Sequence, residues 1–128
     1  MIKFILDAAK ENIFLTIITN KDVYNISHEN SKTNYDKLIV LINNFLNSKG
    51  LKINDISSIY VNRGPGSFAG IRNSLTLVKA IHLAFKIEYY CYSLKDFKEI
   101  DDLKNANIPN LCVKFKVKKN LIKPLYLS

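Results

Sequence analysis

The chain has 128 residues, of which 48% are hydrophobic and 23% are charged. This length suits one domain with a real core, and this composition excludes an intrinsically disordered chain. No apolar run approaches the roughly 18 residues of a membrane span, and we expect no secretory signal at the N-terminus. Cys91 and Cys112 have neither metal-ligand spacing nor a secretory context. We therefore expect reduced, buried thiols in a cytoplasmic protein.

The formal net charge of +8 leaves two interpretations open. Nearly all of the excess comes from lysine, because Arg63 and Arg72 are the only arginines. The lysines reflect either AT-rich coding, which also favours Asn and Ile, or a basic surface that binds nucleic acid.

The first half of the chain predicts three strands and then a helix. The strands are short β-branched, apolar runs separated by polar turns, at residues 2–6, 12–19 and 22–27. Thr33 and Asp36 have the spacing of a capping box, which predicts the start of a helix. We expect that helix to run to about Lys49 and to stop at Gly50.

The second half of the chain alternates strands and helices. The expected elements are strands at 56–61 and 87–92, a helix at about 70–85, a short helix from Ser93 to about Lys104, and a strand at 111–117. Three sequential strands followed by this alternation predict an antiparallel meander extended by two parallel strands. The predicted fold class is α/β: a mixed five-stranded sheet with packed helices, as in a ribonuclease-H-like domain.

The loop NRGPGSFAGIRNS, residues 62–74, holds three of the four glycines in the chain. It lies between a buried strand and a helix N-terminus, where backbone N–H groups can bind an anion. It matches neither a Walker A loop nor the dinucleotide-binding pattern G-x-G-x-x-G. A tight structural turn and a phosphate-binding loop both remain open.

No residues have the spacing of a catalytic or metal site, and we predict neither a metal nor a cofactor. Asp7 fits a turn-capping role better than a role as a phosphate or metal ligand. His28 and His82 lack partners at ligand or triad spacing, and Ser67 lacks the nucleophile-elbow pattern. Arg72 is open between binding an anion and pairing with a carboxylate.

The segment GPGSFAGIR resembles the signature GPGSFTGxR of the bacterial TsaB family. The residues that carry this motif loop are Gly64, Pro65, Gly66, Ser67, Phe68, Gly70 and Arg72. The apolar N-terminal strand, the stretch LKINDISSIYVNR and the final residues KPLYLS also resemble that family. The resemblance implies a lobe of the actin-like ATPase superfamily and a role in making threonylcarbamoyladenosine on tRNA.

The resemblance covers residues 1–97 and the last few residues. We expect residues 1–97 to form a ribonuclease-H-like first lobe and residues 98–128 to be a residual C-terminal segment, not an independent domain. Most of the family's second lobe would then be missing. The family's Asp-Thr-Ser is Asp7-Ala8-Ala9 here, which removes two hydroxyls where related ATPases hold phosphate.

By resemblance, the chain would be a non-catalytic scaffold that pairs with the transferase TsaD and the ATPase TsaE. It would reach tRNA indirectly through that complex, and would form a homodimer when the partner is absent. Two alternatives stay open: a basic tRNA-binding module, and a degenerate ATPase or peptidase of the same superfamily. Lys114, Lys116 and Lys118 would project from one side of the 111–117 strand, either to contact tRNA phosphates or to protect an edge strand.

The two long helices carry more apolar surface than one core-facing stripe requires. On the second helix, Ile71, Leu75, Val78 and Phe85 can face the sheet. We expect a partner interface on the remaining stripes, formed by Tyr35, Ile39, Ile42, Ser74, Leu77, Ile81 and Ala84. The alternative is that these stripes are covered within the fold.

Overall fold

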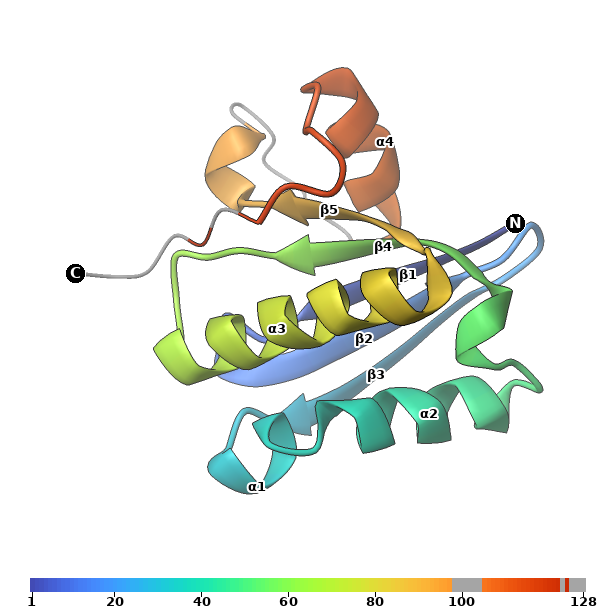
Figure 1. Ribbon diagram of the computed structural model, residues 1–128, viewed down its shortest axis with the longest axis horizontal. Coiled ribbons are helices and arrows are strands. Elements are labelled where there is room, and N and C mark those ends of the chain that lie inside the picture. Colours follow the sequence, from blue (N-terminus) through green and yellow to red (C-terminus); the bar gives the residue numbers. More distant parts are fainter. Residues whose placement is uncertain (98–104, 123, 125–128) are drawn as a thin grey trace.

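The computed structural model describes residues 1–97, 105–122 and 124, which contain a single mixed five-stranded sheet (Figure 1). The strands are β1 Ile2–Asp7, β2 Asn12–Ile18, β3 Val23–Glu29, β4 Ile56–Asn62 and β5 Glu88–Tyr92, in the order β3-β2-β1-β4-β5. β1, β2 and β3 pair antiparallel, whereas β4 is parallel to β1 and β5 is parallel to β4. The predicted meander with two added parallel strands is confirmed.

Helices cover both faces of this sheet (Figure 1). They are α1 Lys32–Tyr35, α2 Leu38–Ser48, α3 Phe68–Phe85 and α4 Ile108–Lys114, with short 3-10 turns at Ile53–Asp55, Leu94–Asp96 and Asn105–Asn107. α2 and α3 share a core with one face of the sheet, and α4 packs on the other face against Ile5, Tyr60 and Tyr92. None of the described helices combines the length and apolarity needed to cross a bilayer.

The predicted first helix is two helices, and its capping box is wrong. α1 begins after Ser31, whose Oγ accepts a hydrogen bond from the Asn34 N–H at 3.4 Å, and the chain breaks helical geometry at Lys37 before α2. Ser31 therefore takes the role predicted for Thr33. The predicted stop at Gly50 is confirmed, because this residue has φ +71° directly after the C-cap of α2.

The predicted strand at 111–117 is wrong, because these residues form most of α4 and the turn after it. Pro109 lies in the first turn, where its missing N–H costs nothing. Ile108, Leu111 and Cys112 are buried at the i, i+3, i+4 spacing of a helix, whereas Val113 is 78% exposed. The alternation of apolar residues with lysine in this segment therefore does not mark a strand. The buried residues lie on one side of α4, and Val113 and Lys114 lie on its solvent-exposed side.

The second long helix is confirmed as α3, which begins at Phe68 with Ser67 as its N-cap. Phe85, predicted to face the sheet, is instead 46% exposed at the last turn. Ser93 caps a 3-10 turn at Leu94–Asp96, and the helix predicted from Ser93 does not continue at Phe97, which has φ -106° and ψ 64°. Residues 98–104 of that prediction lie outside the described residues.

Replacing Lys86 with glycine is expected to stabilise the fold. Lys86 follows α3 in the left-handed conformation, with φ 58°, where a side chain costs about 1–2 kcal/mol and glycine is at ease. Glycine loses more conformational entropy on folding than lysine does, and this offsets part of the gain. We therefore expect the free energy of unfolding, measured by urea denaturation, to rise by about 0.5–1 kcal/mol. Lys79→Gly is the control: within α3 the same change should lower it by about 1 kcal/mol. Equal changes in the free energy of unfolding at both positions would contradict the left-handed conformation of Lys86.

Candidate functional site

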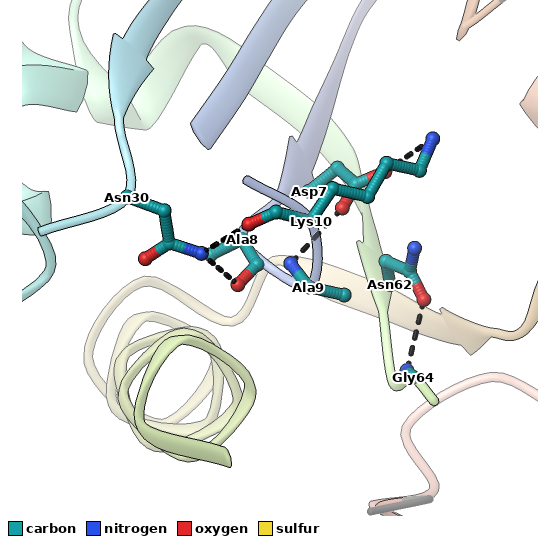
Figure 2. Close-up of polar contacts among 7 residues, drawn as sticks. All are labelled: Asp7, Ala8, Ala9, Lys10, Asn30, Asn62 and Gly64. Atoms are coloured by element: carbon teal, nitrogen blue, oxygen red, sulfur yellow. Dashed lines mark hydrogen bonds and ion pairs between the residues drawn. The ribbon is translucent and has the colours of Figure 1, made fainter. Parts of the chain in front are cut away.

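The carboxyl end of β1 runs into a tight turn that the buried carboxylate of Asp7 organises (Figure 2). Asp7 Oδ1 accepts a hydrogen bond from the Ala9 N–H at 3.1 Å, and Oδ2 lies 3.3 Å from Lys10 Nζ. Both carboxylate oxygens are thus engaged within the turn, as the turn-capping interpretation predicts.

Asn30, which follows the edge strand β3, connects this turn to the end of that strand through hydrogen bonds. Its Nδ2 donates to Ala8 O at 2.8 Å and to Lys10 O at 2.6 Å (Figure 2). Its Oδ1 is buried and has no hydrogen-bond partner within the described part of the chain. The role of Asn30 was not predictable from the sequence, because nothing in its local sequence indicates contact with residues about twenty positions earlier.

The motif loop packs directly on the same turn. The Ser67 N–H donates to Ala9 O at 2.9 Å, and Ser67 Oγ caps α3 by accepting from the Gly70 N–H at 3.1 Å. At the start of the loop, the Gly64 N–H donates to Oδ1 of buried Asn62 at 2.8 Å (Figure 2). The loop therefore joins the end of β4, the start of α3 and the β1–β2 turn.

Two glycines of the loop are required by this close approach. A Cβ at Gly66 would meet the backbone oxygen of Ala9, and a Cβ at Gly70 would meet that of Ala8. The density of glycine is explained by backbone packing, which favours the structural-turn interpretation over a phosphate-binding loop. Ala8 and Ala9 are themselves buried and bring methyl groups, not hydroxyl donors, to this place.

The carboxylate of Asp7 is held in this junction by the Ala9 N–H and Lys10 Nζ. The part of the chain that the structure describes contains no group of three or more His, Cys, Asp or Glu side chains that could hold a metal ion. Of the other motif residues, Pro65 is half-buried, while Phe68 and Arg72 are exposed on α3.

A second feature is an open groove of about 340 Å³ between the α1–α2 segment and α3, which we call the helix groove. Its lining residues are Tyr35, Asp36, Leu38, Ile39, Asn73, Thr76, Leu77 and Ala80. The predicted interface residues Tyr35, Ile39 and Leu77 come together here, each half-buried against the core.

The other predicted interface residues are not in this groove. Ile42, Ser74 and Ile81 are buried in the core, so burial removes them from the surface of the chain. Ser74 Oγ donates to the Ile71 carbonyl at 3.0 Å. The physical reason is that α3 packs against both the sheet and α2, which widens its buried stripe. Ala84 is exposed at the far end of α3.

The three predicted nucleic-acid lysines are exposed but do not share one side of a strand. Lys114 ends α4, with its Nζ 5.5 Å from the ring centroid of Phe115, and Lys116 lies in the following turn with φ 55°. Lys116 and Lys118 line a basic pocket of about 350 Å³ with Arg63 and Lys95. Within it, the Arg63 guanidinium pairs with Asp96 at 2.9 Å.

Comparisons with known proteins agree with this architecture. The model of the family described as "TsaD: tRNA N6-adenosine threonylcarbamoyltransferase" matches residues 26–94. A "tRNA threonylcarbamoyladenosine biosynthesis protein TsaB" of Buchnera aphidicola subsp. Schizaphis graminum is 24% identical over 85 residues, covering 66% of this chain and 40% of that protein. The protein with the same description from subsp. Baizongia pistaciae is 30% identical over 93 residues, covering 70% and 41%. The chain thus spans about two fifths of the length of these curated relatives.

Solved structures show the same fold. YeaZ from Pseudomonas aeruginosa superposes with a TM-score of 0.66 at 18% identity, covering 72% of this chain and 43% of that one. RuvC from T. thermophilus, solved with a Holliday junction substrate, has a TM-score of 0.53 at 10% identity, covering 77% and 68%. The predicted α/β fold class is confirmed. Because the family model covers more than half of the chain and the curated homologues are TsaB proteins, the chain belongs to the TsaD-type threonylcarbamoyltransferase family and, within it, groups with TsaB.

Proposed function

We propose that this chain is a non-catalytic scaffold in the synthesis of threonylcarbamoyladenosine on tRNA, and that it pairs with a TsaD-type transferase. The observation that carries the proposal is the helix groove, where Tyr35, Ile39 and Leu77 leave apolar surface partly uncovered between two helices. Exposed apolar surface of this kind is typical of a protein interface, and helices of a partner can pack their ridges into such a groove. TsaE would join the assembly, and tRNA would be bound through the complex in the cytoplasm.

The junction around Asp7 supports a structural role better than a catalytic one. Its carboxylate oxygens contact the Ala9 N–H and Lys10 Nζ, and the glycine loop fills the space beside Ala9. A carboxylate held in this way braces the start of α3, which forms one wall of the helix groove. The same turn therefore positions the proposed docking surface.

Co-purification with TsaD tests the proposal directly. The tagged chain is co-expressed with the TsaD protein of the same organism, and the eluate is analysed by size-exclusion chromatography with light scattering. We expect a heterodimer, whereas the chain alone should elute as a monomer or a homodimer and show no magnesium-dependent ATP hydrolysis. Separate elution of both proteins, or ATP turnover by the chain alone, would contradict the scaffold proposal.

The basic pocket favours a second candidate, direct contact with tRNA. Four basic side chains line it, from Arg63, Lys95, Lys116 and Lys118, against the single acidic group of Asp96. This excess of positive charge would attract the phosphate backbone without reading sequence.

Replacing Lys114, Lys116 and Lys118 with glutamine is expected to leave folding intact and to weaken tRNA binding by the isolated chain. All three side chains are exposed, so the melting temperature should stay unchanged. Because each phosphate contact contributes roughly 0.7–0.9 to the slope of log K against log salt, we expect this slope to fall by about 2. The matched control is glutamine at Lys21, Lys37 and Lys52, which are exposed elsewhere. An equal loss in the control would show a general charge effect and would exclude Lys114, Lys116 and Lys118 as a specific tRNA site.

A further inference from the structure

Arg72 ends the family motif, but it takes no part in the junction that the motif glycines form. It lies on the exposed side of α3 and lines a cavity of about 440 Å³ between α3 and the segment that follows α4. The volume lies within the range of small-molecule sites. The cavity adjoins the helix groove at Thr76, which lines both, but its other lining residues differ from those of the groove.

Two cations flank this cavity from one helix. Arg72 and Lys79 are seven residues apart, which places them about two turns apart on the same side of α3. Neither side chain has an ion-pair partner among the residues that the structure describes. The sequence left Arg72 open between an anion and a carboxylate partner, and the described part of the chain supplies no carboxylate.

Tyr89, which carries a buried hydroxyl, lines the same cavity. Tyr89 has a relative exposure of 0%, and its phenolic oxygen makes no hydrogen bond to any of the residues that the structure describes. Buried polar groups in proteins are nearly always paired, so this hydroxyl is a donor that a bound ligand could use. It is independent of the two cations, because it comes from β5 and not from α3.

The outer wall of the cavity is anchored to the sheet. The Tyr89 N–H donates to Asn120 Oδ1 at 3.0 Å, and the Asn120 N–H donates to Tyr89 O at 2.7 Å. Leu75 from α3 and Ile122 from the anchored segment supply apolar surface between the polar groups. Cations, a free donor and apolar walls thus converge on one cavity.

We propose that this cavity binds a small organic anion: a carboxylate or phosphate group held between Arg72 and Lys79, on an apolar body that packs against Leu75 and Ile122. The Arg72 guanidinium can bind either oxyanion with two parallel hydrogen bonds, and the Tyr89 hydroxyl donates a further one. This site goes beyond the scaffold proposal and does not depend on it, because it needs no partner protein.

NMR titration of the ¹⁵N-labelled chain tests the site with four probes: phenyl phosphate, benzoate, benzyl alcohol and inorganic phosphate. We expect saturable shifts at the amides of Thr76, Tyr89 and Asn120 with an aromatic anion. The neutral alcohol lacks the anionic group and inorganic phosphate lacks the apolar body, so each should bind at least about tenfold more weakly than the aromatic anion. Tighter binding of phenyl phosphate than of benzoate assigns the site to phosphates, and the reverse order assigns it to carboxylates.

Three variants complete the test. Arg72→Ala should weaken binding of the aromatic anion by about tenfold or more. Tyr89→Phe should weaken it severalfold without lowering the melting temperature, since its hydroxyl has no hydrogen-bond partner to lose among the described residues. Lys21→Ala, on a distant exposed turn, should change nothing. The proposal is overturned if neither aromatic anion gives saturable shifts, if Arg72→Ala binds normally, or if inorganic phosphate binds as tightly as phenyl phosphate.

Discussion

Replacing Gly70 with alanine is expected to lower the free energy of unfolding by about 3 kcal/mol, which is a large part of the stability of a small domain. The added Cβ would meet the backbone oxygen of Ala8 and lie 3.0 Å from Asn30 Nδ2, so α3 would have to move away from the β1–β2 turn. Helix propensity alone predicts the opposite sign, because alanine is better than glycine within a helix by about 1 kcal/mol. Urea denaturation with an unchanged m-value measures the difference.

Gly50→Ala is the matched control, because it separates backbone conformation from crowding. Gly50 has φ +71° but nothing lies within 4 Å of an added Cβ, so this variant should lose only about 1 kcal/mol. If Gly70→Ala is as stable as the unmodified chain or more stable, the contact between the motif loop and the turn does not constrain the fold.

Replacing Leu77 with glutamate is expected to weaken pairing with TsaD by about 100-fold or more while the isolated chain still folds. Leu77 is half-buried in the helix groove, so in the free chain a carboxylate there can reach water. In the complex the carboxylate would be covered without a partner, which costs on the order of 3 kcal/mol of association free energy. Pull-down with TsaD measures the pairing, and thermal melting of the free variant measures its folding.

Leu83→Glu is the control for this variant, because Leu83 lies on the same helix, is 69% exposed and does not line the helix groove. It should pair with TsaD normally. If the folded Leu77 variant pairs as well as the control, the helix groove is not the docking surface. If Leu77→Glu fails to fold, binding of TsaD by Tyr35→Ala and Ile39→Ala decides the same question, and normal binding by both would reject the groove.

The sequence by itself determined the sheet and most of the helices. The strands were predictable because each is a short β-branched run closed by turn residues, and their order along the chain leaves few right-handed topologies. α3 was also predictable from local sequence, since apolar periodicity predicted a helix at about 70–85, although the structure begins it two residues earlier, after the N-cap Ser67. The family followed from the motif loop, whose spacing is specific even where its physical role was open.

Only the tertiary structure decided which helical residues are buried and why the motif loop needs its glycines. Ile42, Ser74 and Ile81 were predicted to lie on the surface, but they are buried because α3 packs against α2 as well as the sheet. The periodicity of a helix does not predict how many neighbours the helix packs against. The α4 segment looked like a strand because its lysines alternate, whereas packing on Tyr60 and Tyr92 selects helical spacing. Gly70 is needed because Ala8, far away in the sequence, brings its carbonyl oxygen to within contact of α3. Local patterns record what each segment prefers, but contacts between distant segments exist only once the chain has folded.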